Sequence, residues 1–136
     1  MTAMSVSRSA ARRRVLCVDD NPDVLELQKC ILEHSGYEVL LASNGADGIS
    51  LAKGRKVDLA LLDYEMPLMM GTEVAQRLRD MQPALPIIFV SGSDLPQEAA
   101  MVADCCVSKT KMGKALVQEV DRLLSRRRPG RRGTTH

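Results

Sequence analysis

Four short apolar runs lie along the chain, and polar side chains follow each of them. The runs cover residues 15–18, 57–62 (interrupted only by Asp58), 87–90 and 105–107. Runs of this length are typical of strands in a parallel sheet that is covered on both faces. The polar residues that follow them are Asp19 with Asp20, Asp63, Ser91 and Lys109. Because the carboxyl ends of parallel strands meet at one edge of a sheet, we expect these side chains to lie together.

Segments with helical spacing lie between these runs. The first begins after Asn21 and Pro22, a typical N-cap and first helical residue, and ends at Gly36. Its predicted inner face is the stripe of Val24, Leu27 and Ile31, flanked by Leu25 and Leu32, with Cys30 nearby. Further helices are expected at about residues 45–54, 72–81, 97–102 and 111–127, and an edge strand at 37–42. This alternation predicts a parallel sheet with right-handed crossovers and helices on both faces.

The length and the charge distribution suggest one folded unit between two basic ends. A chain of 136 residues suffices for a single domain with its own core. Residues 15–125 hold 10 Lys and Arg and 17 Asp and Glu, for a net charge of −7, although the whole chain carries +2. We therefore expect a disordered basic leader at 1–13, a folded domain at 14–127 and a disordered Arg-rich tail at 128–136. Non-specific nucleic-acid binding by these ends is the less favoured alternative.

The composition also excludes several classes of protein. No stretch approaches the ~20 apolar residues of a membrane span, and the chain has no Trp, one Phe and two Tyr, too few for a stacking platform. Cys17, Cys105 and Cys106 fall in strand-like runs, where free thiols behave as small buried hydrophobes. Because the four cysteines lack metal-ligand spacing and disulfides are not expected, the reducing cytoplasm is the predicted location.

The polar residues at the predicted sheet edge suit a cation and a phosphoryl group. Asp19, Asp20 and Asp63 would repel one another, which raises the pKa of at least one of them unless a cation binds. Mg²⁺ prefers oxygen ligands and needs only a few carboxylates. The hydroxyl of Ser91 and the ammonium group of Lys109 can both donate to phosphoryl oxygens.

Four motifs mark the ends of the predicted strands: 18–22 (Val-Asp-Asp-Asn-Pro), 62–67 (Leu-Asp-Tyr-Glu-Met-Pro) with Gly71, 90–92 (Val-Ser-Gly) and 108–109 (Ser-Lys). With these motifs the chain resembles the receiver domain of two-component response regulators, specifically the stand-alone, single-domain kind. The resemblance covers about residues 14–127. It implies a flavodoxin-like (βα)5 three-layer sandwich with a five-stranded parallel sheet in the order 2-1-3-4-5.

The resemblance also implies a site and a function. Asp63 would accept a phosphoryl group from a histidine kinase or a phosphotransfer protein, with Mg²⁺ as the cofactor. The implied metal ligands are Asp20 and Asp63 directly, Asp19 through water and Glu65 through its backbone carbonyl, and the implied catalytic residues are Asp63, Ser91 and Lys109. The protein would signal by binding an unidentified downstream protein, and it would not be a turnover enzyme.

Three features depart from the usual receiver pattern. Cys106 stands where the family usually has an aromatic ring, and Thr110 stands where it usually has a proline preceded by a cis peptide bond. The interval from Ser91 to Lys109 is also about one helical turn of ~3.6 residues shorter than is typical. All three changes fall on the face that receivers normally use to contact partners. We therefore expect the phosphorylation chemistry to be retained and its readout to be altered.

Three alternatives share parts of this pattern. A phosphate shuttle or sink in a phosphorelay would use the same site. A degenerate receiver would act only as an interaction module. A small Mg²⁺-dependent phosphatase of the haloacid dehalogenase kind also uses an Asp nucleophile, but it resembles a pattern with a second Asp two residues later, where this chain has Glu65.

Overall fold

The computed structural model describes residues 12–92 and 94–126, and strands and helices alternate along this part of the chain. The elements are β1 (Arg14–Val18), α2 (Pro22–His34), β2 (Glu38–Ala42), α3 (Gly45–Gly54), β3 (Leu59–Asp63), α4 (Gly71–Met81), β4 (Ile87–Ser91), α5 (Gln97–Val102), β5 (Cys105–Ser108), the 3₁₀ turn η1 (Lys109–Lys111) and α6 (Lys114–Arg126). The predicted leader 1–13 and tail 128–136 lie almost wholly outside the described residues.

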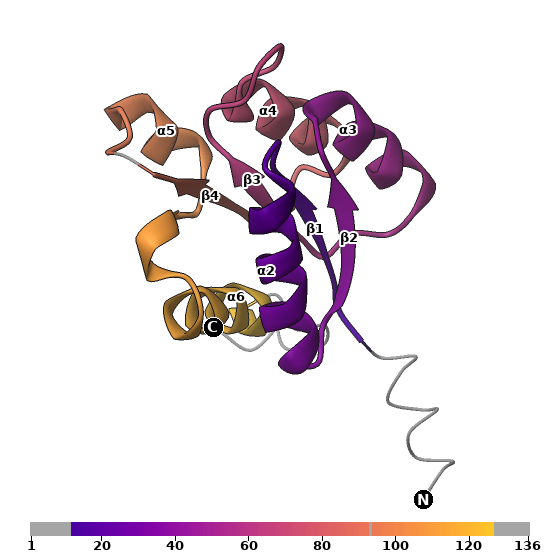
Figure 1. Ribbon diagram of the computed structural model, residues 1–136. Coiled ribbons are helices and arrows are strands. Elements are labelled where there is room, and N and C mark those ends of the chain that lie inside the picture. Colours follow the sequence, from indigo (N-terminus) through magenta and orange to yellow (C-terminus); the bar gives the residue numbers. More distant parts are fainter. Residues whose placement is uncertain (1–11, 93, 127–136) are drawn as a thin grey trace, which may run out of the picture.

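The five strands form one parallel sheet in the order β2-β1-β3-β4-β5, which confirms the predicted topology (Figure 1). Every residue of β3 and β4 is buried, whereas β2 at one edge is only partly covered. The register places Val18 beside Leu62 and Asp63 beside Val90. Consequently β1, β3 and β4 end side by side, and the loops that follow them share one edge.

Two apolar cores, one on each face of the sheet, hold the three layers together. On one face the sheet packs against α3, α4 and α5, where Val74, Leu78 and Ala99 are buried. On the other face it packs against α2 and α6, where Leu32 and Leu116 are buried. Figure 1 shows the same division, with the sheet between the two groups of helices. In the described part of the chain, no helix is long and apolar enough to cross a membrane.

Asparagine caps fix where two of the helices begin. The Asn21 side chain accepts a hydrogen bond from the Asp23 amide at 2.9 Å, and Pro22 is the first residue of α2. The Asn44 side chain accepts from the Asp47 amide at 2.8 Å at the start of α3. Such caps satisfy amide groups that have no partner inside the helix. The α2 cap follows directly after β1 and therefore also sets how that helix enters the sheet edge.

Arg79 ties α4 to the elements on either side of β4. Its guanidinium donates to the Leu85 carbonyl at 3.0 Å, to the Val102 carbonyl at 2.9 Å and to the Asp104 carboxylate at 2.9 Å. Asp104 also accepts from the Ile87 amide at 2.8 Å. One side chain thus holds the start of β4, the end of α5 and the approach to β5 together.

The predicted inner face of the first helix is wrong by about one residue. Leu25, Gln28 and Leu32 are buried, whereas Leu27 is 48% exposed and Cys30 is also exposed. A rotation of one residue around a helix is about 100°, since 3.6 residues make a turn. The stripe of Val24, Leu27 and Ile31 therefore borders the solvent, although it is the more uniformly apolar of the two.

Two further predictions differ from the structure near β5. Cys17 is buried as expected, but Cys105 is half-buried and Cys106 is exposed because β5 is an edge strand with few covering residues. The last helix, predicted from residue 111, begins at Lys114. The 3₁₀ turn η1 and Gly113, with a φ of 86°, come first and redirect the chain.

Candidate functional site

Three aspartates meet at the carboxyl edge of the sheet. Asp19 and Asp20 follow β1, and Asp63 is the last residue of β3. Each offers a carboxylate oxygen, and these three oxygens lie within 4.8 Å of one another. Asp19 is fully buried and Asp63 is 4% exposed, whereas Asp20 faces the solvent. The cluster is thus buried at its base and open on one side.

Lys109 reaches this cluster from the turn after β5. Its Nζ lies 3.2 Å from Asp19 Oδ2 and 3.4 Å from Asp63 Oδ2. Burial alone would lower the pKa of Lys109, but its contacts with Asp19 and then with Asp63 outweigh burial, so the pKa is raised. The ammonium group therefore stays charged and faces two carboxylates at once.

The single positive charge of Lys109 does not balance the three carboxylates of the cluster. Burial, and next the charge of Asp19, raises the pKa of the Asp63 carboxyl to about 6, although Lys109 acts in the opposite direction. Asp19 Oδ1 accepts from the Asn21 amide at 2.9 Å, but the buried Oδ2 has no well-aligned hydrogen bond. Oxygen donors of this kind, with one open side, fit a hard divalent cation such as Mg²⁺.

The loop after β3 is held close to the acid cluster by a glycine. The Gly71 amide donates to the Tyr64 carbonyl at 2.8 Å. A Cβ atom at Gly71 would lie 2.6 Å from the backbone oxygen of Asp63 and 2.9 Å from Tyr64 Cα, too close for any side chain. The Glu65 side chain is exposed and is not one of the three clustered carboxylates. The predicted role of Glu65 concerns its backbone carbonyl and stays a prediction.

Ser91 lies on the neighbouring strand at the same edge. It is the last residue of β4 and is 5% exposed, and β4 is registered so that Val90 lies beside Asp63. A cavity of about 350 Å³ opens next to Ser91, with Cys106 and Ser108 among its lining residues. Cys106 contributes only a small thiol side chain to this lining.

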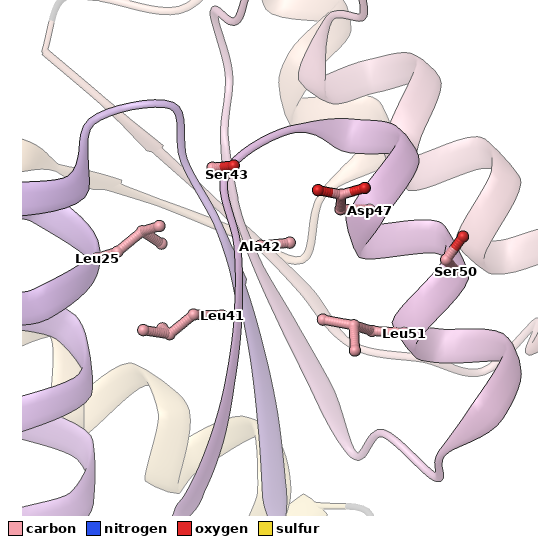
Figure 2. Close-up of a pocket in the computed structure, with 7 residues that line it drawn as sticks. All are labelled: Leu25, Leu41, Ala42, Ser43, Asp47, Ser50 and Leu51. Carbon is pink, nitrogen blue, oxygen red and sulfur yellow. The ribbon is translucent and has the colours of Figure 1, made fainter.

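A second hollow, of about 490 Å³, lies at the β2 edge of the sheet between α2 and α3. Figure 2 shows Leu25, Leu41 and Leu51 around it, with the side chain of Asp47 near its rim. The Asp47 carboxylate accepts from the Asn44 amide group at 3.1 Å and so belongs to the cap of α3. This hollow gathers no set of catalytic or metal-binding groups, so the acid cluster remains the candidate site.

Comparison with known families agrees with this geometry. Residues 15–121 match the family model described as the response regulator receiver domain. The chain belongs to this family. It is a receiver domain of two-component systems. Receiver domains bind Mg²⁺ at an acidic pocket, and this chain has a cluster of three aspartates.

Curated relatives of the receiver include regulators and sensor kinases. It is 39% identical over 83 residues to the protein PilH of Pseudomonas aeruginosa, covering 60% of this chain and 69% of PilH. It is 33% identical over 100 residues to the CAI-1 autoinducer sensor kinase/phosphatase CqsS of Vibrio cholerae, covering 71% of this chain and 15% of CqsS. The receiver spans 34% of the Bacillus subtilis regulator PhoP, with 35% identity over 82 residues and 60% of this chain covered. It therefore corresponds to only a part of these last two proteins.

Solved receiver structures have the same fold. A CheY-like receiver domain protein from Methanospirillum hungatei superposes with a TM-score of 0.80 at 28% identity, covering 85% of this chain and 96% of that one. The response regulator TrrA from Thermotoga maritima, solved in complex with Mg²⁺-BeF, gives a TM-score of 0.76 at 33% identity, covering 82% and 98%.

The structure brings together most of the predicted site and adds contacts that the sequence pattern did not indicate. Asp19, Asp20, Asp63 and Lys109 meet as expected, and Ser91 lies at the same edge. The peptide bonds of the described residues are all trans, including the one before Thr110, and α5 has only six residues. The sequence pattern names Ser108 and Thr110, which flank Lys109, but predicts no role for their hydroxyl groups, because Ser and Thr are common in turns.

Proposed function

We propose that Asp63 accepts a phosphoryl group from a phosphohistidine of a kinase or phosphotransfer protein in the cytoplasm. One Asp63 carboxylate oxygen attacks the phosphorus, the phosphorus–nitrogen bond breaks, and the imidazole nitrogen keeps the electron pair. The product is an acyl phosphate, as expected of a carboxylate nucleophile. Such transfers depend mainly on positioning and on neutralising the charge of the phosphoryl oxygens.

The chain's own residues divide this task. Lys109 Nζ already lies 3.4 Å from Asp63 Oδ2. When Asp63 is phosphorylated, the ammonium group can therefore form an ion pair with a phosphoryl oxygen. Ser91, on the adjacent strand, can donate a hydrogen bond from its hydroxyl to a second phosphoryl oxygen. This position of Lys109, between two acids at the mouth of the cluster, is the observation that carries the proposal.

Asp19, Asp20 and Asp63 would hold Mg²⁺, with the Glu65 carbonyl as a further oxygen ligand. When bound, the ion would supply positive charge that offsets the repulsion of the carboxylates and of the incoming phosphoryl group. Support comes from the 4.8 Å grouping of the three oxygens and from the buried Asp19 Oδ2, which lacks an aligned hydrogen bond. The related TrrA structure contains Mg²⁺ with a beryllium fluoride.

The solvent-facing stripe of α2 is a suitable docking surface for the phosphodonor. Leu27 is 48% exposed, and Val24 and Ile31 are half-buried on the same side. Leu68, in the loop after Asp63, is fully exposed and adopts a φ of 73°, which is uncommon for a residue with a side chain. The helix α2 begins shortly after Asp19 and Asp20, and Leu68 follows Asp63 in the next loop. A helix that carries the phosphohistidine could pack on these apolar groups while it presents its phosphoryl group.

The direct test is labelling with acetyl phosphate, which needs no partner. Wild-type protein should take up one phosphoryl group per chain in the presence of Mg²⁺ and none with EDTA. Asp63→Asn should abolish the label, whereas Asp80→Asn, an exposed aspartate on α4, should keep it. The adduct should be stable to acid and labile to base, as acyl phosphates are. Undiminished labelling of Asp63→Asn would overturn the proposal.

The labelling result and three further measurements separate the remaining alternatives. Repeated turnover of a phosphomonoester would indicate a phosphatase, and no label at all would indicate a degenerate receiver. A shuttle differs from a receiver that signals by binding, since only the shuttle passes its phosphoryl group on to a second histidine protein. Partner affinity with and without beryllofluoride would show whether Cys106 and the short α5 alter the readout.

A further inference from the structure

We infer that Ser108 and Thr110 form a hydroxyl latch that positions Lys109 for contact with the phosphoryl group. The inference deepens the proposed function, because it rests on Lys109 having the role described above. Both residues are exposed and neither touches the acid cluster in any described contact, so they act through Lys109 as positioning residues. The latch is made entirely of residues next to Lys109 in the chain.

Two hydrogen bonds close the latch. The Ser108 hydroxyl accepts from the Thr110 amide at 3.2 Å and caps the turn η1, whose first residue is Lys109. The two hydroxyl oxygens, Ser108 Oγ and Thr110 Oγ1, lie 2.8 Å apart. A hydroxyl has one proton to donate and two lone pairs, so Ser108 can accept from the amide and still exchange a hydrogen bond with Thr110.

Few other contacts fix the backbone around Lys109. Lys109 sits between Val107, which is buried, and Met112, which packs partly against the core. The residues between these anchors are exposed or half-exposed, and Gly113, at a φ of 86°, adds no side chain to hold the turn. Residue 110 is Thr, so the restricted φ of a proline is absent at this position, and the peptide bond before it is trans. The hydroxyl pair supplies a local constraint instead.

The direction of the Lys109 side chain depends on that constraint. From the first position of a single 3₁₀ turn, the side chain extends back over the sheet edge to within 3.2 Å of Asp19 and 3.4 Å of Asp63. A fixed turn limits the backbone conformations around Lys109, so its flexible side chain starts from one position close to the acid cluster. Loss of the latch should therefore weaken contacts made by Lys109 and leave the three aspartates as they are.

The test compares Ser108→Ala, Thr110→Val and the double variant with Lys109→Ala and wild type. Calorimetry measures Mg²⁺ affinity alone, and then the affinity for beryllofluoride at saturating Mg²⁺. Lys109→Ala should weaken beryllofluoride binding by about 100-fold, since it removes a charged donor. Each latch variant should weaken it by about three- to tenfold, the scale of one lost capping bond, with Mg²⁺ affinity changed by less than about twofold.

Three controls make the result decisive. Thr110→Ser keeps the hydroxyl and should restore wild-type affinity, and Ser125→Ala, at the far end of α6, should have no effect. In the Lys109→Ala background, the latch substitutions should have no further effect, because they act through the same group. The double latch variant should lose little more than the worse single variant.

Each failure has its own meaning. If Lys109→Ala binds beryllofluoride as tightly as wild type, the proposed function of Lys109 fails. If Lys109→Ala is impaired but the latch variants are not, the latch is overturned and the role of Lys109 stands. A latch variant that weakens Mg²⁺ and beryllofluoride binding equally, or that still acts without Lys109, would show a general structural effect and would also overturn the latch.

Discussion

Asp63 illustrates how a residue of the candidate site is held at a cost to stability. It is nearly buried, its pKa is raised to about 6 by burial and by Asp19, and Lys109 offsets this effect only in part. A carboxylate in such a place is stabilised by a ligand and not by the fold. The repulsion among these carboxylates therefore favours cation binding.

Replacing Asp63 with Asn should stabilise the metal-free protein. We expect the free energy of unfolding at pH 7.5 in EDTA to rise by about 1–2 kcal/mol, because one of three crowded carboxylates loses its charge. Urea denaturation followed by circular dichroism measures the difference. Saturating Mg²⁺ should stabilise the wild type more than the variant and so narrow the gap. An equal gain from Asp80→Asn would show that the effect is not specific to the cluster.

Replacing Gly71 with Ala should damage the site through the backbone. The new Cβ atom would meet the Asp63 oxygen at 2.6 Å, so the loop after β3 must shift. We expect a loss of about 1–3 kcal/mol in stability, the usual range for overpacking, and slower labelling by acetyl phosphate. Gly54→Ala is the matched control, since no atom lies within 4 Å of its Cβ position at the end of α3. That variant should be neutral or slightly stabilising, and a comparable loss there would contradict the steric argument.

At the scale of elements, the short helix α5 depends on Arg79 for its stability. Six residues are too few for a helix to be stable by itself, and its last turn is held by the bond from Arg79 to the Val102 carbonyl. Arg79→Lys removes the planar set of donors but keeps the charge. We expect a loss of about 1–3 kcal/mol and faster amide hydrogen exchange in α5, detected by mass spectrometry. Arg77→Lys affects only an exposed pair with Glu73 and should leave exchange in α5 unchanged.

The edge strand β5 gives a prediction about pH. Burial, and then the contact with Glu119, raises the pKa of the Cys105 thiol to about 11. In a variant whose only cysteine is Cys105, the rate of alkylation by iodoacetamide should rise about tenfold per pH unit from pH 8 to 10, since the thiolate reacts. Glu119→Gln should lower the pKa and speed the reaction at pH 8. A plateau near pH 9 in the Glu119-containing protein would contradict this assignment.

At the scale of the whole molecule, most of the fold could be predicted because each buried strand is an apolar run that leads directly into a polar side chain of the candidate site. The inner face of α2 could not be predicted from the sequence. Two apolar stripes lie one residue apart, and the connection from β1 selects the one that contains Gln28, because Asp19 holds Asn21 and Asn21 caps the helix. The start of α6 at Lys114 could not be predicted either, because it follows a turn around Lys109. Hydrogen bonds between Ser108 and Thr110 define that turn, and the sequence pattern does not show them.

Cys17 should report on unfolding of the whole molecule. It is fully buried in β1, between β2 and β3, and burial followed by the charge of Asp19 raises its pKa. With the other three cysteines changed to Ser, its reaction with a disulfide reagent should proceed at the rate of global opening and slow further in Mg²⁺. Stopped-flow unfolding in urea provides the rate for comparison. Rapid reaction in the native protein would contradict the position of β1 in the sheet.

The two ends of the folded body have a practical consequence for handling this protein. Arg13, just before β1, and Ser125, near the end of α6, line one hollow of about 430 Å³ together with Tyr37 and Asp121, at the edge where the strands begin. A five-residue strand spans roughly 17 Å, and Asp63 lies at its opposite end. A bead, dye or fusion partner whose linker joins the folded body at Arg13 or Ser125 therefore starts on the far side from the proposed acceptor carboxylate. Tethered assays can leave the reactive edge facing the solution.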